Sequence, residues 1–331
     1  MSSCLTVIAP QLLSTLLQAD NHAPLVRALA RADALPAQFT DIDTAVLQWF
    51  GIRDWAGVGA VTAAVDFAVA VDGAHWLRAD PVHLRADPTR VILFDAAAVG
   101  LDDDESDALL AHLNAGLADD DLHFERGSAP TRWYVRQTTP QLLGLASPRA
   151  LRGQAVEDSL DALRRSGALQ KLMTQAQMLL YEAPTNEARV ASGRAPISSV
   201  WFWGGGSPAM PRTMPGGAVL GDDDLLAACA RHAGLTYRRD VAALAALLRD
   251  ETGDVVLLDN HDLASCNLLG FERDILAPAL AALRRGRLAQ FVIHAFPFDL
   301  VFTPAARWRV WRRAEPFLAS LRAQTHLAAE T

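Results

Sequence analysis

The stretch Val200–Gly206, VWFWGGG, places three large apolar side chains directly before three glycines. Trp201 and Trp203 alternate with Phe202, which predicts a strand buried on both faces, as a central strand of a parallel sheet is. Gly204–Gly206 allow positive φ and leave backbone amides uncovered, which is the geometry of an anion-binding nest. A simple glycine turn explains the same residues, and the sequence leaves both interpretations open.

Strands and helices alternate from this stretch to the end of the chain. Short apolar runs, interspersed with helical patterns, occur at GAVL (217–220), DVVLLD (254–259) and RLAQFVIHAF (287–296), and LTVIAP (5–10) is a similar run near the N-terminus. Continuous apolar strands between helices predict an α/β fold with a mostly parallel sheet that helices cover on both faces.

Residues 75–194 depart from this alternation. The run 90–95 predicts a strand, 101–120 a helix with an acidic first turn, 122–137 a hairpin around Gly127-Ser128, and about 156–182 a long helix that ends before Pro184. The sequence therefore predicts a discontinuous α/β core of 1–74 and 195–331, with 75–194 as an inserted α+β subdomain.

The net charge and the apolar runs of the chain limit the kinds of partner that it can bind. A formal net charge of −8 argues against a nucleic-acid or anionic-membrane binder, and charged residues interrupt every long apolar run before it reaches the length of a bilayer. The three cysteines lack zinc-like spacing, which is typical of a cytoplasmic protein. The chain has a single lysine, Lys171, and no Gly-Lys-Ser/Thr sequence, so a Walker A loop is excluded.

Ligand sites in parallel sheets lie at the carboxyl ends of the strands. Gly204–Gly206, the run Asp259–Asp262 and His294 all follow or end predicted strands. Asp259, His261 and Asp262, joined by His294, offer the hard oxygen and imidazole ligands that suit Mn²⁺ or Mg²⁺. The alternative is equally open: the two aspartates cap a turn, His261 faces solvent, and His294 is a surface residue.

The segment 182–208, EAPTNEARVASGRAPISSVWFWGGGSP, resembles a segment of the cofactor-independent, archaeal-type phosphoglycerate mutases. That family's pattern runs His-Pro-x-Asn-x-x-Arg, Gly, Pro-Ala-Asn and Trp-x-Trp-Gly-x-Gly. The residues that match it here are Pro184, Asn186, Arg189, Gly193, Pro196, Trp201, Trp203, Gly204 and Gly206. Ala183 replaces the family's His, and Ser198-Ser199 replaces Ala-Asn.

Over nearly its full length the chain resembles the bacterial RpfE-type regulatory family, often labelled phosphoglycerate mutase. The features that carry this resemblance are HWLRADPVHLRAD (75–87), QMLL (177–180), SVWFWGGG (199–206) and RWRVWRR (307–313). The resemblance implies an alkaline-phosphatase-like core carrying an inserted subdomain. In the mutases, two divalent metals and a serine nucleophile move a phosphoryl group between hydroxyls of a glycerate.

The same resemblance identifies an arginine as a candidate anion-binding residue. WLRADP (76–81) is similar to the mutases' Arg-Ala-Asn segment, which would make Arg78 a clamp for phosphate or carboxylate. A surface ion pair of Arg78 with Asp80 is the alternative. Arg132 could form a similar clamp, but an exposed position on a hairpin face explains it more simply, and we predict that position. The run 307–313 is predicted as a docked C-terminal helix, with binding of an acidic partner protein or a nucleotide as the alternative.

This chain lacks part of the catalytic residue set of the mutases. Their first strand ends in Asp-Gly, whose Asp binds metal, whereas the corresponding strand here ends in Pro10-Gln11. No serine nucleophile can be placed, and Asp259, His261 and Asp262 have a shorter spacing than the mutases' Asp-Glu-x-Gly-His segment. We therefore expect a regulatory or phospho-ligand-binding relative without the full two-metal site; the alternative is an active metal-dependent mutase or phosphatase.

Overall fold

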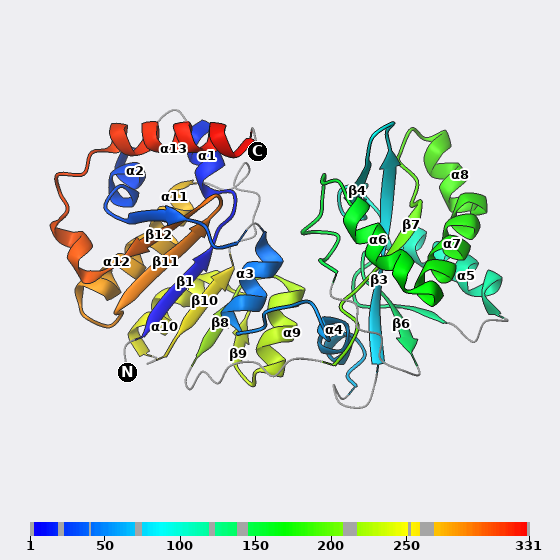
Figure 1. Ribbon diagram of the computed structural model, residues 1–331. Coiled ribbons are helices and arrows are strands. Elements are labelled where there is room, and N and C mark those ends of the chain that lie inside the picture. The colour runs from blue at the N-terminus through cyan, green and yellow to red at the C-terminus, as the bar shows by residue number, and fades with distance from the viewer. Residues whose placement is uncertain are drawn as a thin grey trace. The chain divides into compact units, whose positions relative to one another are not determined.

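The computed structural model of the 331-residue chain describes residues 3–18, 23–39, 41–69, 75–118, 123–137, 145–207, 217–250, 253–258 and 268–329. The chain forms two compact units (Figure 1). The first combines Met1–Gly51 with Pro211–Thr331, and the second is Ile52–Met210. The second unit is wider than the segment 75–194 that the sequence predicts as an insertion, and those domain limits stay a prediction.

The first unit contains a mostly parallel sheet, so the predicted α/β class is confirmed. Within the described residues its strand order is β2-β12-β11-β1-β10-β8-β9. All neighbours from β11 to β9 pair in parallel, and β12 runs antiparallel to both β11 and β2. The strands are β1 (Cys4–Ile8), β2 (Asp33–Pro36), β8 (Ala218–Leu220), β9 (Thr236–Arg238), β10 (Val255–Leu258), β11 (Gln290–Ala295) and β12 (Phe298–Phe302).

Helices cover both faces of this sheet, which is why its central strands are mostly apolar and buried. Every residue of β10 is buried, as is every residue of β1 after Cys4. The helical elements are α1 (Leu12–Gln18), α2 (Ala23–Leu29), α3 (Ile42–Trp49), α9 (Asp224–His232), η2 (Val241–Ala243), α10 (Leu244–Asp250), α11 (Leu268–Gly270), η3 (Phe271–Leu276), α12 (Ala277–Arg284), η4 (Pro304–Trp308) and α13 (Ala314–Ala329).

The second unit is built on an antiparallel sheet. Its strands are β3 (His75–Ala86), β4 (Val91–Asp95), β5 (Phe124–Arg126), β6 (Trp133–Gln137) and β7 (Ser199–Trp203), in the order β4-β3-β6-β5 with β7 also paired to β3. Its helices are α4 (Val58–Asp66), α5 (Asp103–Gly116), α6 (Glu157–Arg165), α7 (Gly167–Glu182) and α8 (Pro184–Ala191). The predicted strand at 90–95, the helix after Leu101 and the hairpin around Gly127 are confirmed.

The tryptophan-rich strand corrects one prediction. β7 is buried at all of its positions, as expected, but it belongs to the second unit and pairs antiparallel with β3 rather than lying inside the parallel sheet. Trp203 lies opposite Arg78, and Trp201 lies opposite Asp80. Burial on both faces fixes the apolar pattern of a strand but says nothing about the direction of its partner.

Two helix predictions also need correction. The expected helix at 156–182 is two helices, α6 and α7, which meet at Ser166, and Pro184 begins α8 as its first residue. Pro is tolerated there because the first N–H of a helix needs no intrahelical partner. Among the described residues, no helix combines the length and apolar character needed to cross a bilayer.

The run 307–313 is not a docked helix. Its first two residues end the short helix η4, a turn at 310–311 follows, and α13 begins only at Ala314. Trp308 and Trp311 are 65% and 69% exposed. Arg309 and Arg312 hold the run in place, since both guanidiniums form ion pairs with Asp33 of β2, at 2.8 and 3.0 Å. The arginines therefore fix the backbone, while the indoles remain at the surface.

Helix α4 approaches the sheet of the second unit unusually closely. The Gly59 N–H donates to the Gly204 carbonyl at 2.8 Å. A Cβ on Gly59 would lie 2.5 Å from the Trp76 carbonyl oxygen and 2.9 Å from that of Gly204. Both obstacles are backbone atoms of packed elements, so the contact needs glycine at position 59.

We predict that Gly59→Ala destabilises the chain by about 1–3 kcal/mol, because α4 must move away from β3 and β7. The urea unfolding midpoint, followed by tryptophan fluorescence, measures this. Gly167→Ala is the matched control: it opens α7, and no heavy atom lies within 4 Å of the added Cβ. An unchanged midpoint for Gly59→Ala, or an equal loss in the control, would contradict the proposed packing.

Candidate functional site

The carboxyl edge of the parallel sheet is the first candidate site. Three strands end there in register, since Ile8 of β1 pairs with Leu258 of β10 on one side and with His294 of β11 on the other. Neighbouring strands are about 4.8 Å apart, so His294 lies about 10 Å from the end of β10 along the sheet. The other predicted metal ligands, Asp259, His261 and Asp262, lie outside the described residues.

His294 has a specific partner. Its Nδ1 lies 2.7 Å from Oδ1 of Asp299, the residue directly opposite it on β12. Asp299 is buried, His294 is half-buried, and the Phe39 ring packs edge-on against the imidazole at 5.3 Å between centroids. The carboxylate fixes the ring and leaves Nε2 as the nitrogen available to a ligand, an arrangement that also orients metal-binding histidines.

The rest of this edge offers little more for metal chemistry. Within the described residues, no group of three or more His, Cys, Asp or Glu side chains could hold a metal ion. Asp223 is engaged as the N-cap of α9, where it accepts from the Leu226 N–H. A Mn²⁺ or Mg²⁺ site therefore stays a prediction that depends on Asp259, His261 and Asp262.

The end of β1 has neither a carboxylate nor an activated serine. Pro10 and Gln11 follow the strand and lead into α1. The Ser14 hydroxyl donates to the Gln11 carbonyl at 2.9 Å and is solvent-exposed. This contact is local to the helix and supplies no general base, which an attacking serine hydroxyl needs.

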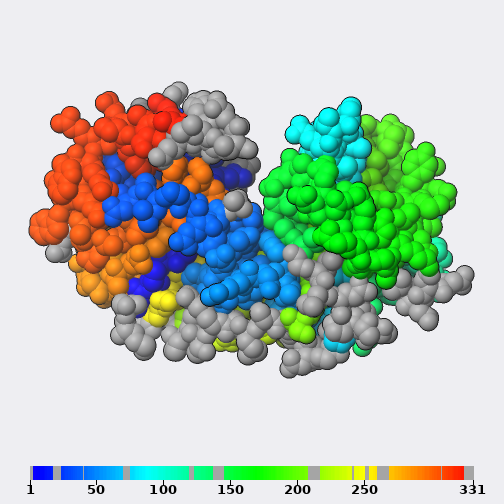
Figure 2. Space-filling model, viewed as in Figure 1, coloured from blue at the N-terminus to red at the C-terminus, as the bar shows by residue number. Residues whose placement is uncertain are grey.

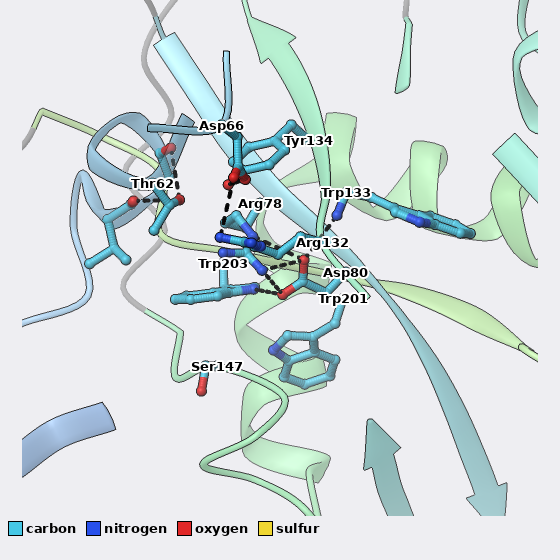
Figure 3. A network of polar contacts seen from close by, with 12 residues as sticks. Thr62, Asp66, Arg78, Asp80, Arg132, Trp133, Tyr134, Ser147, Trp201 and Trp203 are labelled. Carbon is cyan, nitrogen blue, oxygen red and sulfur yellow. Dashed lines mark hydrogen bonds and ion pairs between the residues drawn. The ribbon is translucent and has the colours of Figure 1, made fainter. Parts of the chain in front are cut away.

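Arg78, the predicted anion clamp, lies in the second unit and is buried in an ion pair (Figure 3). Its Nε and Nη2 donate to Oδ1 of Asp80 at 2.9 and 2.8 Å, and Nη2 also reaches Oδ2 at 2.8 Å. The Trp203 indole N–H donates to the same carboxylate at 2.8 Å, and the Trp133 backbone N–H does so at 3.2 Å. The pair with Asp80 is thus present, but it is internal rather than on the surface.

Aromatic rings enclose the guanidinium of Arg78. Its central carbon lies 4.8 Å from the Trp203 ring centroid and 5.1 Å from that of Tyr134. Burial raises the pKa of Asp80, whereas the carboxylate raises the pKa of Arg78 against its own burial. The geometry favours the ionic form, because a protonated acid would turn an O–H towards N–H donors.

A second buried pair adjoins the first. Arg132 Nη1 lies 3.3 Å from Oδ1 of Asp66, and the Tyr134 hydroxyl donates to Oδ2 of Asp66 at 2.6 Å. Burial raises the pKa of Tyr134, so its phenol stays protonated and remains a donor. Arg132 is buried, which corrects the prediction that it lies on an exposed hairpin face.

The glycines after β7 are buried beneath the start of α4. The carbonyls of Gly204 and Gly205 accept from the N–H groups of Gly59 and Gly57, at 2.8 and 3.1 Å. Gly204 and Gly206 have φ of 68° and 106°, so both need glycine. These residues belong to the second unit and His294 to the first, so the predicted sites do not share one sheet. Anion binding by Gly204–Gly206 stays a prediction.

The other residues of the mutase-like segment also support the second unit. The Asn186 amide donates to the carbonyls of Leu180 and Ile197 at 2.7 and 2.8 Å, and accepts from the Ile197 N–H at 2.8 Å. Arg189 is fully buried; it donates to the Val99 carbonyl at 2.6 Å and pairs with Glu105. Both residues hold α8 in place. The sequence motif marked them but not this role.

No family model matches the chain. It is 26% identical over 152 residues to the 2,3-bisphosphoglycerate-independent phosphoglycerate mutase of Methanosarcina barkeri, a match that covers 43% of this chain and 37% of that protein. The chain thus spans little more than a third of the length of that curated relative.

Two solved structures show weak likeness. The cofactor-independent phosphoglycerate mutase of Thermoplasma acidophilum has 15% identity over 92% of this chain and 90% of its own, with a TM-score of 0.43. The PH0037 protein of Pyrococcus horikoshii has 17% identity over 91% and 87%, with a TM-score of 0.46.

We predict that Trp203→Phe destabilises the second unit by about 1.5–3 kcal/mol beyond its packing loss, because the Asp80 carboxylate loses a buried donor. Trp201→Phe is the matched control, since that indole is equally buried but donates to the neutral Ala146 carbonyl at 3.0 Å. Chemical denaturation of both variants measures the difference. Equal losses in the two variants would show that the charge of Asp80 adds nothing.

Proposed function

We propose that this chain is a phosphoglycerate-mutase-like protein that binds a small phosphorylated acid without the two-metal chemistry of an active mutase. One observation carries the proposal: the matched motif residues hold the second unit together, whereas the described edge of the parallel sheet offers a single oriented imidazole. A regulatory relative of the mutases would keep the residues that support their fold and lose the residues that carry out their reaction. The regulatory role itself rests on the RpfE-type resemblance.

The described residues do not fit a two-metal centre. Such a centre needs several oxygen and nitrogen ligands around ions about 3.5–4 Å apart. His294 with Asp299 would supply one ligand and its supporting carboxylate. Pro10 and Gln11, which follow the first strand, supply neither a carboxylate nor an imidazole. We therefore derive no reaction step through a metal.

The second candidate is an active metal-dependent mutase or phosphatase. The His294–Asp299 pair favours this function. In metalloenzymes, a carboxylate commonly orients the imidazole that binds the metal. That function would need Asp259, His261 and Asp262 as further ligands and Arg78 on the substrate. Arg78 would then have to exchange its contacts with Asp80 for those with an anion.

Incubation with 3-phosphoglycerate and Mn²⁺ or Mg²⁺ separates the two functions. We expect no 2-phosphoglycerate, no released phosphate and less than one metal ion per chain after dialysis, while calorimetry detects binding of 3-phosphoglycerate. Turnover that His294→Ala abolishes, and that His123→Ala leaves intact, would overturn the proposal in favour of the enzyme. His123 is exposed and lies in the second unit, so it controls for loss of an unrelated imidazole.

A further inference from the structure

The first unit contains an apolar pocket that the proposed function does not use. Its volume is about 150 Å³, and it lies between the end of α2, the end of α12 and the segment that leaves β12. C-terminal residues, coloured orange to red, form a large part of the face of this unit that Figure 2 shows. The lining residues are Ala28, Arg31, Leu280, Leu283, Arg284, Phe302, Pro304 and Ala306.

The register of the sheet separates this pocket from the carboxyl edge. Phe302 pairs with Phe291, near the start of β11, whereas Asp299 pairs with His294, near its end. Three residues of strand span about 10 Å. The pocket therefore lies towards the amino end of the parallel strands, and a ligand there would not touch His294.

The lining combines apolar surface with two cations. Six of the eight lining side chains are apolar, so the interior favours a hydrocarbon group over water; an apolar cavity of this volume accommodates one benzene-sized ring. The two remaining residues, Arg31 and Arg284, are half-buried and exposed. In the part of the chain that the structure describes, neither guanidinium has a side-chain hydrogen bond or ion pair.

Two neighbouring arginines already have a carboxylate partner, unlike Arg31 and Arg284. Arg309 and Arg312 are both neutralised by Asp33, and Arg309 also donates to the Arg31 backbone carbonyl at 3.2 Å. The carboxylate available beside the pocket is thus already shared by two guanidiniums. An anion supplied by a ligand would give Arg31 and Arg284 the partner that the described residues do not provide.

We propose that this pocket binds a small carboxylic acid whose apolar part is about the size of one six-membered ring. The ring would contact Leu280, Leu283 and Phe302, and the carboxylate would face the two arginines. Polyhydroxylated phosphate esters fit less well. Their hydroxyls would give up hydrogen bonds to water, and the apolar lining would not replace them. This site is independent of the proposed function at the carboxyl edge.

Titration of the full chain with benzoate tests the proposal, using saturation-transfer NMR and calorimetry. We expect saturable binding of benzoate and at least about tenfold weaker binding of benzamide, which has the same shape without the charge. Arg31→Met should weaken benzoate binding by about tenfold or more, and Leu280→Trp should abolish it by filling the pocket. Arg285→Met is the control and should bind as the parent does, since Arg285 does not line the pocket.

Circular dichroism and the thermal midpoint establish that each variant is folded. No benzoate binding by the folded parent chain would overturn the proposal. So would equal affinity for benzamide, or binding that Leu280→Trp leaves unchanged. If Leu280→Trp unfolds the chain, Leu283→Phe replaces it, with the same expected loss of binding and the same contradicting result.

Discussion

The second unit depends on one interaction: the buried ion pair between Arg78 and Asp80. The two residues are two positions apart in β3, so their side chains lie on the same face of the strand. Removing each charge from water costs several kcal/mol, and the pair repays this only if its hydrogen bonds are complete. Arg78, Trp133 and Trp203 supply those bonds from β3, β6 and β7.

This requirement fixes the register of three strands at once. A slip of β7 by one residue would turn the Trp203 indole to the other face and leave the Asp80 carboxylate short of a donor. A second close contact explains why glycines follow the strand. The backbone at the start of α4 donates hydrogen bonds to the carbonyls of Gly204 and Gly205, and a Cβ on Gly204 would lie 2.9 Å from the Gly59 nitrogen. The tryptophans and the glycines are thus parts of one packing arrangement.

The sequence predicted the parallel sheet well because its strands are continuous apolar runs that alternate with helices. It failed at β7 because burial on both faces looks the same in parallel and antiparallel sheets. It failed at Trp308 and Trp311 because their spacing fits a helix, although the arginines between and beside them bind Asp33. Arg132 was misplaced because its partner, Asp66, is distant in sequence.

The candidate site was predictable only in part. The position of His294 at a strand end followed from the strand pattern. Its partner Asp299 was missed, although the two residues flank Phe296-Pro297, a turn signal between two apolar runs that indicates a hairpin. The pocket beside Arg31 had no sequence signal, because α2, α12 and the residues after β12 meet only in the folded chain.

A double-mutant cycle at Arg78 and Asp80 tests the central claim most directly. If the pair is a structural element, Arg78→Met and Asp80→Asn should each lower the free energy of unfolding by about 3–5 kcal/mol, since each leaves one buried charge without its partner. The double variant should lose no more than either single variant. A loss below about 1 kcal/mol for Arg78→Met, together with loss of 3-phosphoglycerate binding, would contradict this account and make Arg78 a ligand-binding residue.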